Sequence, residues 1–475
     1  MTNDTHESDR RRRHRNERIA AAIVVAIALA TTIGVIVWQR RVTHELRSNT
    51  TYIPKKEKIT PEVLLLSELV RIDTSTPDGA AKGARWIAAY LAKNGIRAEI
   101  IESAPGRLNV YARLPGRQAG DGLLLFNHID VVPPGSDWNV PPFEARIAFN
   151  QMWGRGTLDM KAMTICQLLA LVDVARSGRP PEHDLAFLAT ADEETGSEYG
   201  MRWILANRPD VLEGIRYGIT EGGVTEMQTE RMTYFGIEVG GKQEVELTLE
   251  GNDVETLRKA RIALEPFMFA REPERVLPVV RAYFQAISPT RTSYRADLAD
   301  IDKAIRAGRF WRLPMAYRDL TQNTLWISAP QRSEKSGRWS MTVRLVNLPD
   351  EIPENRVQWL MSRVAPYGLR IGEIKQKQGP VPVSSHDTVL FSLIAGEAKR
   401  RYGVTAGLQL LYRSATDSRF LRPAGIICYG VSPYPVTFYQ SLSIHRGNER
   451  IQLDGFVEGT AFLRNVVRQW SASTP

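Results

Sequence analysis

The chain contains very little cysteine. Only Cys166 and Cys428 occur among its 475 residues, and both lie in apolar runs. Scaffolds held together by disulfides and zinc modules built from cysteine need more thiols than this, so the sequence excludes both classes. The two thiols are expected to act as small core residues.

The chain also lacks a concentrated charge of one sign outside its N-terminus. The formal net charge is +9, and the first fifty residues hold nine arginines against five acids. The surplus left for the other residues is too dilute for a nucleic-acid-binding surface. Hydrophobic residues at 43% and charged residues at 24% exclude a disordered chain or one with many membrane spans.

Long hydrophobic runs are absent except for one. Residues 19–38 (IAAAIVVAIALATTIGVIVW) carry no charge, and as a helix they would cross a hydrocarbon core of about 30 Å. Six arginines precede this run and three follow it closely, which predicts a single-pass membrane protein with a cytoplasmic N-terminus and the rest of the chain extracytoplasmic. A signal peptide cleaved after Ala28-Leu29-Ala30 is the alternative.

The remaining chain divides by its pattern of apolar residues. After a basic tail (1–18), the anchor (19–38) and a polar linker (39–59), apolar strands alternate with amphipathic helices over residues 60–235. One of these predicted helices runs from about Ala80 to Lys93 and ends at Asn94-Gly95. Over residues 236–378 the pattern of apolar residues is typical of a smaller α+β insert. The alternation of strands and helices returns over residues 379–475. This predicts an α/β fold whose mainly parallel sheet is covered by helices on both faces and interrupted by a smaller domain.

Polar side chains able to bind a metal ion stand at the ends of predicted strands, where α/β sheets form their ligand sites. Each motif alone is weak, because a lone His-x-Asp pair is usually a surface pair. Histidine is scarce in this chain, and these residues stand together at predicted strand ends. A shared metal site is therefore the better interpretation. The candidate residues are His128, Asp130, Asp159, Glu193, Glu194, Glu221 and His445.

The chemistry of these side chains favours two divalent ions. Three carboxylates (Asp159, Glu194 and Glu221) against two such ions leave one positive charge, which a hydroxide would cancel. Nitrogen and oxygen ligands suit zinc, which lowers the pKa of water to about 7. Glu193 is then left as the general base, and Asp130 can accept a hydrogen bond from the imidazole of His128.

Several runs together resemble a known family: HIDVV, PPFEA, GRGTLDMKA and ADEETGSEYG, with TDSR and SIHRGNER downstream. They look like the zinc-dependent aminoacylase/carboxypeptidase metallopeptidases, which include succinyl-diaminopimelate desuccinylase, glutamate carboxypeptidase and the Gly-Xaa carboxypeptidases. The sequence is most similar to the carboxypeptidase S and N-fatty-acyl-amino-acid synthase/hydrolase branch. The resemblance implies a zinc exopeptidase-like core and a lid/dimerisation role for 236–378.

The resemblance also implies roles for individual residues. His128 and Glu194 bind separate or shared zinc ions, Asp159 bridges the pair, and His445 is a ligand of the second zinc. It assigns the base to Glu193, a cis peptide bond to Asp159-Met160, and a contact with a substrate carboxylate to Arg419 of the TDSR run.

Three departures from the family pattern concern the second zinc and the lid. The branch usually has Asp-Glu, with the Asp as ligand, where this chain has Thr220-Glu221, so either Glu221 replaces that ligand or the second site is weakened. The Gly-Gly-His-Ser segment that supplies an oxyanion-stabilising histidine is replaced by residues 249–253 (LEGND). A lid arginine expected at Val346 is found instead at Arg344. Losing one oxyanion donor typically costs about 100–1000-fold in rate.

Together these features predict a membrane-anchored di-zinc hydrolase that cleaves the amide bond of a peptide's C-terminal residue or of an N-acyl amino acid. The alternative is a catalytically impaired family member that acts as a binding or scaffold protein. The expected partners are a small peptide or N-acyl amino acid, two zinc ions, the membrane and a second copy of the chain as a homodimer, with no nucleic acid.

Overall fold

The computed structural model describes residues 59–228, 231–268, 272–332, 337–377, 379–411 and 416–473. The chain divides between residues 57 and 58, and the fold reported below is that of the second unit, residues 58–475. The predicted tail (1–18) and anchor (19–38) lie outside the described residues, as does nearly all of the predicted linker (39–59).

The predicted localisation as a single-pass membrane protein is corrected by the structure. Within the described ranges, none of the helices combines the length and the apolar composition that a bilayer span requires. The longest, α15 (Leu453–Ala472), has 20 residues but carries Asp454, Glu458, Arg464 and Arg468. Charged side chains are costly at membrane depth, so α15 is unsuited to cross a bilayer.

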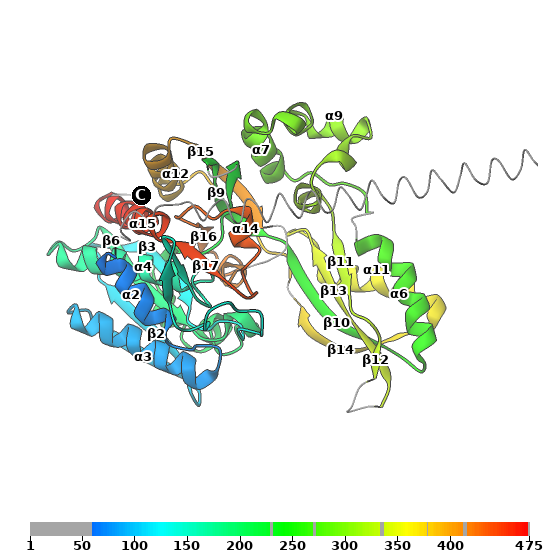
Figure 1. Ribbon diagram of the computed structural model, residues 1–475, viewed down its shortest axis with the longest axis horizontal. Helices are drawn as coiled ribbons and strands as arrows, with labels where there is room; N and C mark the ends of the chain where they lie inside the picture. The colour runs from blue at the N-terminus through cyan, green and yellow to red at the C-terminus, as the bar shows by residue number, and fades with distance from the viewer. Residues whose placement is uncertain are drawn as a thin grey trace, which may run out of the picture. The chain divides into compact units, whose positions relative to one another are not determined.

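The main sheet has nine strands in the order β1-β2-β6-β3-β7-β16-β9-β15, with β8 paired to β9 (Figure 1). Strand β8 spans Thr225–Gln228, β9 spans Arg231–Gly241 and β15 spans Thr405–Leu411. Its centre is parallel: β6 (His183–Thr190), β3 (Gln118–His128), β7 (Ile215–Thr220) and β16 (Ile427–Gly430) run the same way. The edge strands β1 (Ala98–Ala104) and β2 (Arg107–Leu114) are antiparallel additions. The prediction of an α/β fold with a mainly parallel sheet is therefore confirmed.

Alternation along β3 shows why this sheet forms here. Leu123 and Leu125 belong to one hydrophobic cluster, whereas Leu124 and Phe126 belong to another. Successive side chains of a strand point to opposite faces, so an unbroken apolar run is what a strand buried on both faces needs. Each cluster also gathers apolar side chains from helices, and the two clusters draw on different helices.

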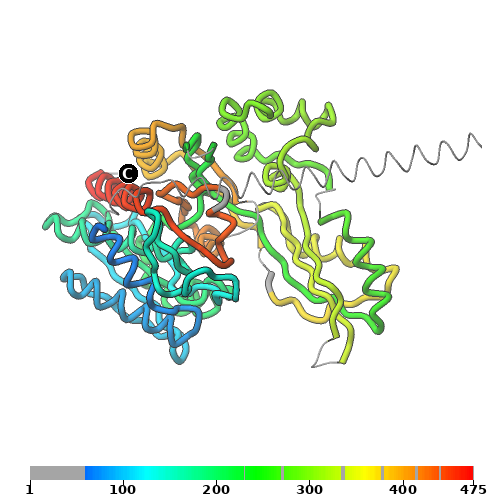
Figure 2. The backbone as a smooth tube through the Cα atoms, in the orientation of Figure 1, coloured from blue at the N-terminus to red at the C-terminus, as the bar shows by residue number. Residues whose placement is uncertain are grey.

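Two helices of the main domain begin at prolines, which favour the first turn of a helix. The helix α2 spans Pro61–Val70 and α3 spans Pro77–Lys93, each with proline in its first turn. Helices α4 (Lys161–Arg176) and α12 (Val389–Tyr402) contribute to the same cluster as α2, α3 and α15, whereas α5 (Met201–Asn207) and α13 (Ser418–Leu421) contribute to the cluster on the other face of the sheet. The C-terminal helix α15, red in Figure 2, packs against α4 and α2.

A second, five-stranded sheet is antiparallel and is built from β10 (Gln243–Gly251), β11 (Thr324–Ile327), β12 (Gln331–Arg332), β13 (Trp339–Asn347) and β14 (Arg370–Lys377). Every second residue of β10 is buried, and with α6 (Val254–Met268) and α11 (Pro353–Val364) it forms a separate hydrophobic cluster. The other face of β10 carries glutamates.

The apolar pattern of residues 236–378 predicts one inserted domain, but parts of this segment pack with the main sheet. Strand β9 (Arg231–Gly241) belongs to the main sheet, so the chain leaves that sheet at Lys242. Helix α7 (Pro278–Ile287) and the short helices α8 (Arg295–Ala299), α9 (Ile301–Arg306) and α10 (Met315–Arg318) contribute to the main hydrophobic cluster, not to that of the small sheet. The proposed domain limits at 236 and 378 stay a prediction.

Candidate metal centre

The candidate ligands come from the carboxyl ends of neighbouring parallel strands. His128 is the last residue of β3, Glu221 follows β7, and Glu193 and Glu194 lie in a 3-10 turn after β6. Parallel neighbours end at the same edge of a sheet, so these side chains meet there. Asp159 enters this edge from the segment before α4.

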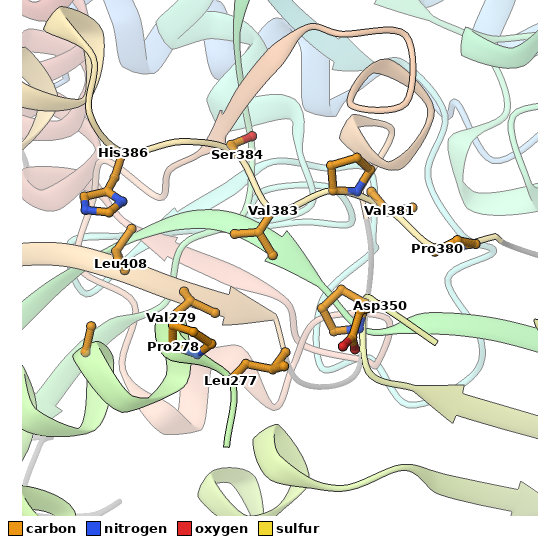
Figure 3. Close-up of a pocket in the computed structure, with 13 residues that line it drawn as sticks. Leu277, Pro278, Val279, Asp350, Pro380, Val381, Val383, Ser384, His386 and Leu408 are labelled. Carbon is orange, nitrogen blue, oxygen red and sulfur yellow. The ribbon is translucent and has the colours of Figure 1, made fainter. Parts of the chain in front are cut away.

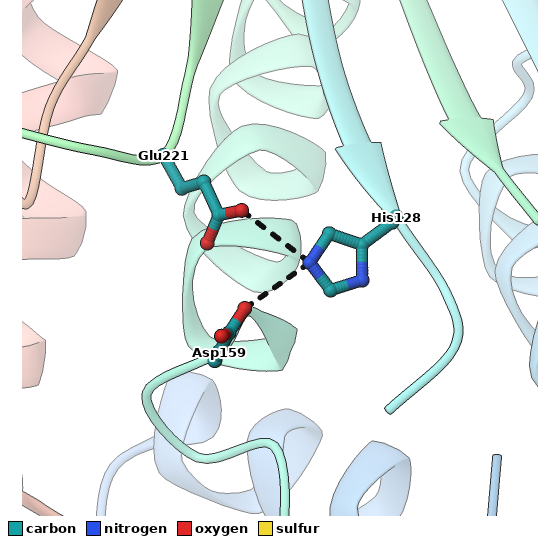
Figure 4. A group of neighbouring side chains, drawn as sticks. All are labelled: His128, Asp159 and Glu221. Carbon is teal, nitrogen blue, oxygen red and sulfur yellow. Dashed lines mark hydrogen bonds and ion pairs between the residues drawn. The ribbon is translucent and has the colours of Figure 1, made fainter. Parts of the chain in front are cut away.

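One group of side chains surrounds Nε2 of His128 (Figure 4). This atom lies 3.1 Å from Oδ1 of Asp159 and 3.4 Å from Oε1 of Glu221. One potential ligand atom from each of the three residues lies within 4.8 Å of the other two. The imidazole of His128 is buried, with 1% of its side chain exposed.

A second group is formed around the other oxygen of Asp159. Nε2 of His445 lies 2.9 Å from Oδ2 of Asp159 and 3.1 Å from Oε2 of Glu194. The backbone of His445 is in the left-handed region, with φ at 62°. Such conformations in non-glycine residues concentrate at functional sites, where the surrounding structure holds them. The two groups share Asp159.

The predicted partnership of His128 and Asp130 takes a different form from the expected one. Nδ1 of His128 donates to the backbone carbonyl of Asp130 at 2.9 Å, whereas the carboxylate lies 3.7 Å away. A carbonyl can only accept, so this bond places the proton on Nδ1 and leaves Nε2 facing Asp159 and Glu221. The Asp130 carboxylate instead accepts the backbone N–H groups of Glu193 and Glu194, both at 3.0 Å.

The loop that carries Asp159 is fixed by a residue that the sequence did not reveal as a site component. Glu449 is fully buried, and its Oε1 accepts the backbone N–H of Leu158 at 2.8 Å and that of Asp159 at 3.3 Å. Its Oε2 pairs with Nη1 of Arg155 at 2.6 Å. The peptide bond Asp159-Met160 is cis, as the family resemblance implied.

The electrostatics of the centre are those of a crowded set of acids balanced by imidazolium groups. Burial opposes ionisation of Asp159, but hydrogen bonds from His128 and His445 outweigh it and hold its pKa well below the usual range. Hydrogen bonds to Asp159 and Glu194 raise the pKa of His445 to about 10. Burial and repulsion from Asp159 raise the pKa of Glu221 to about 8.

The residues present fit a pair of divalent cations. Each group offers one imidazole nitrogen and two carboxylate oxygens, a donor set typical of zinc. Oε1 of Glu194 is buried and makes no hydrogen bond among the described residues. A buried carboxylate oxygen without a donor is costly, and a cation beside it would remove that cost.

Glu193 is not part of either group. Its Oε1 lies 3.4 Å from Nη1 of Arg419, and burial, opposed by the attraction of Arg419, raises its pKa well above the usual value. Arg419 belongs to α13, whose preceding residue Asp417 accepts hydrogen bonds from Thr190 at 3.2 Å and from Ser197. Asp417 was not expected from the sequence, although it lies in the TDSR run.

The small sheet shows where two departures from the family pattern lie. Arg344 on β13 pairs with Glu244 and, at 2.8 Å, with Glu246 of the neighbouring strand β10. Its guanidinium also lies 5.6 Å from the ring centre of Trp326. Asn252, within the segment 249–253 that replaces the family's histidine-containing segment, is exposed directly after β10.

Two cavities share Pro380 and Val381 as lining residues. One, of about 680 Å³, is mainly apolar (Figure 3). Its lining includes Leu277, Val279, Val383 and Leu408, with Asp350, Ser384 and His386 as its polar members. The other, of about 760 Å³, is more polar and is lined in part by Arg419.

Comparison with known proteins gives one family model, described as peptidase family M20/M25/M40, which matches residues 124–469. The chain is 34% identical over 152 residues to a succinyl-diaminopimelate desuccinylase of Wolbachia pipientis subsp. Culex pipiens, a match covering 31% of this chain and 37% of that enzyme. An uncharacterized metallohydrolase of Methanocaldococcus jannaschii is 26% identical over 208 residues, covering 38% of this chain and half of that protein.

Among solved structures, an M20 family metallo-carboxypeptidase of Sulfolobus solfataricus superposes with a TM-score of 0.67 at 20% identity, covering 87% of this chain and 99% of that one. Human carnosine dipeptidase 1 gives 0.65 at 14% identity, covering 86% of this chain and 96% of that one. At these identities the likeness concerns the fold.

Proposed function

Because the chain belongs to the peptidase M20/M25/M40 family, we propose that it is a metal-dependent amidohydrolase. Its substrate would be a short peptide that loses its C-terminal residue, or an N-acyl amino acid that loses its acyl group. The observation that carries this proposal is the carboxylate of Asp159, which belongs to both groups of potential metal ligands.

His128, Asp159 and Glu221 would hold one ion, and Asp159, Glu194 and His445 the other, with zinc as the proposed metal. Bound zinc supplies Lewis-acid polarisation of a carbonyl and activates water near neutral pH. The Nδ1–H bond from His128 to the carbonyl of Asp130 supports this assignment, because it orients Nε2 as a ligand.

Glu193 is the proposed general base. A buried carboxyl group with a raised pKa can accept a proton from water and return it to the leaving amine. Its turn is held by the two backbone hydrogen bonds to the Asp130 carboxylate, which makes Asp130 a positioning residue. Arg419, 3.4 Å from Glu193, is the proposed partner of the substrate carboxylate.

The apolar cavity favours an acyl group on the substrate. Its leucine, valine and proline lining removes hydrocarbon from water, which contributes about 0.8 kcal/mol per buried CH₂. It shares Pro380 and Val381 with the cavity that contains Arg419, so one molecule can place its apolar and polar ends in both. An N-acyl amino acid has such an apolar end, its acyl group, and such a polar end, its carboxylate.

A second candidate function is binding without turnover. The sequence has no histidine between His183 and His386, so the small sheet supplies none to stabilise an oxyanion. We also propose a homodimer formed through residues 236–378, as the family resemblance implies. These two proposals are tested together with the first one.

The deciding experiment measures metal content and hydrolysis on one preparation of the full chain. We expect two zinc ions per chain and turnover of N-acyl amino acids. Glu193→Gln should keep both ions and lose at least about 100-fold in kcat, because only proton transfer is removed. Equal rates in both proteins would refute the enzyme proposal, and two ions without any turnover would favour the binding protein. Sedimentation of the same sample reports the dimer.

A further inference from the structure

The polar cavity is lined by four segments of the chain that are far apart in sequence. One of them lies at and after the turn with Glu193 and Glu194 and contributes Thr195, Gly196, Glu198, Arg202 and Leu205. Helix α13 contributes Arg419 and Phe420, and the small sheet contributes Gln243 and Lys375. The cavity therefore adjoins the proposed general base through Arg419, whose guanidinium lies 3.4 Å from Glu193.

Cations predominate in the lining of this cavity. Arg202, Lys375 and Arg419 line it, and Glu198 is the acid among its described lining residues. Lys375 has a loose contact of 3.6 Å with Glu246. Arg202 is exposed and makes no ion pair with any residue in the described ranges.

The acids of the neighbouring strand offset only part of this positive charge. Glu244 and Glu246 on β10 both pair with Arg344, which does not line the cavity. Glu246 also contacts Lys375, and Glu244 attracts Arg419. An anionic group in the cavity would share these two cations with the acids and would find Arg202 without an acidic partner among the described residues; hydrogen bonds between ionised partners are about twice as strong as neutral ones.

Gln243, which also lines this cavity, has an unused acceptor. Its side chain is 1% exposed, and its Nε2 donates to the carbonyl of Gly241 at 2.8 Å. That bond fixes the amide, and Oε1 is left without a hydrogen-bond partner among the described residues. An unsatisfied buried acceptor destabilises the protein, and an N–H donor that reached it from the cavity would remove that cost.

We propose that the polar cavity selects the amino acid released by the reaction and prefers one with an acidic side chain. Arg202 and Lys375 bind the side-chain carboxylate, Arg419 binds the α-carboxylate, and Oε1 of Gln243 accepts the N–H of the amino group. The inference rests on the proposed function and names the substrate class of that site, namely N-acyl or peptidyl derivatives of glutamate and aspartate.

The test compares L-glutamate with L-glutamine, two products that differ by one charge and cannot be hydrolysed further. Their dissociation constants are measured by calorimetry on the zinc-loaded full chain. Glutamate is expected to bind at least about tenfold more tightly at low ionic strength, and the ratio should fall as salt rises. Equal constants for the two ligands would overturn the proposal.

Variants separate the two recognition elements. Arg202→Gln and Lys375→Gln should each reduce the glutamate-to-glutamine ratio about threefold or more, and together they should abolish it. Gln243→Met should weaken both ligands equally, because both present the same amino group. Arg85→Gln, at an exposed arginine of α3, is the matched control and should keep the wild-type ratio. A ratio that survives the double substitution would contradict the assignment.

The failure of this inference can be told apart from the failure of the proposed function. The same proteins are assayed for hydrolysis of N-acetylglutamate and N-acetylglutamine. Turnover of both at equal kcat/KM would reject the acidic preference and keep the amidohydrolase. Preferential binding of glutamate without any turnover would keep the cavity assignment and reject the amidohydrolase.

Discussion

Nε2 of His445 lies 2.9 Å from Oδ2 of Asp159, although 286 positions separate the two residues in the chain. The opposite oxygen of the same carboxylate lies 3.1 Å from His128. One aspartate thus connects the end of a central strand with a loop near the C-terminus. The proposed di-metal centre depends on this connection.

Asp159→Asn should remove both metal ions together. The amide offers one oxygen in place of two and carries no charge, so neither group keeps an anionic bridging ligand. We expect less than one zinc per chain by elemental analysis and a loss of activity of at least about 1000-fold. Zinc should also cease to raise the melting temperature, because a ligand stabilises only the state that binds it.

The control for this substitution is Asp121→Asn. Asp121 is a surface residue paired with Arg216 at 2.9 Å, and its loss should change neither metal content nor activity. An Asp159→Asn protein that retains two zinc ions would show that Asp159 does not bridge them.

Glu449→Gln should destabilise the fold around the metal centre. Glu449 and Arg155 form a buried pair with exposed side-chain fractions of 0% and 1%. Removing one charge leaves the other buried without its partner, which costs about 3–5 kcal/mol. Urea unfolding at neutral pH should show this loss. The same change at the exposed Glu144, paired with Arg146, should cost less than about 1 kcal/mol. Equal costs would contradict the role of Glu449.

Glu397 should make stability fall in acid. Burial opposes its ionisation, but hydrogen bonds from Arg400, Asn465 and Arg401 outweigh burial and lower its pKa in the folded chain. A lowered folded pKa contributes stability above the ordinary glutamate pKa, and this is lost as pH falls through the folded value.

The destabilisation caused by Glu397→Gln should therefore be largest at neutral pH and shrink below about pH 4, where the unfolded and then the folded carboxyl is protonated. Urea midpoints between pH 3 and pH 7 measure it. Glu265→Gln, which removes a carboxylate paired with Arg261 on the surface of α6, is the control for a surface ion pair. A constant difference for Glu397→Gln over this range would contradict the assignment.

Local sequence was a good guide to the main elements. Asn94-Gly95 predicted the end of α3, and Gly95 adopts a positive φ there. The start of α3 was predicted three residues too late, at Ala80 instead of Pro77. Thr76 caps that end by accepting the N–H of Gly79 at 3.2 Å, a local signal that was present but not used.

The sequence did not predict which distant segments pack against one another. The apolar residues of α7 pack against β15 (Thr405–Leu411) of the main sheet, though the texture of this segment resembles that of the small domain. An amphipathic helix shows that it needs an apolar partner but does not say which of two sheets provides it. Only the three-dimensional arrangement decides this.

The sequence by itself determined which side chains stand at strand ends, and hence the candidate ligands, because strand ends and turns are local properties read from short runs. It could not determine that Glu449 holds the loop of Asp159, that Asp417 fixes α13, or that Gln243 leaves an acceptor unused. Each of these roles depends on hydrogen bonds and burial contributed by segments far apart in the chain. Distances of that kind exist only once the chain has folded.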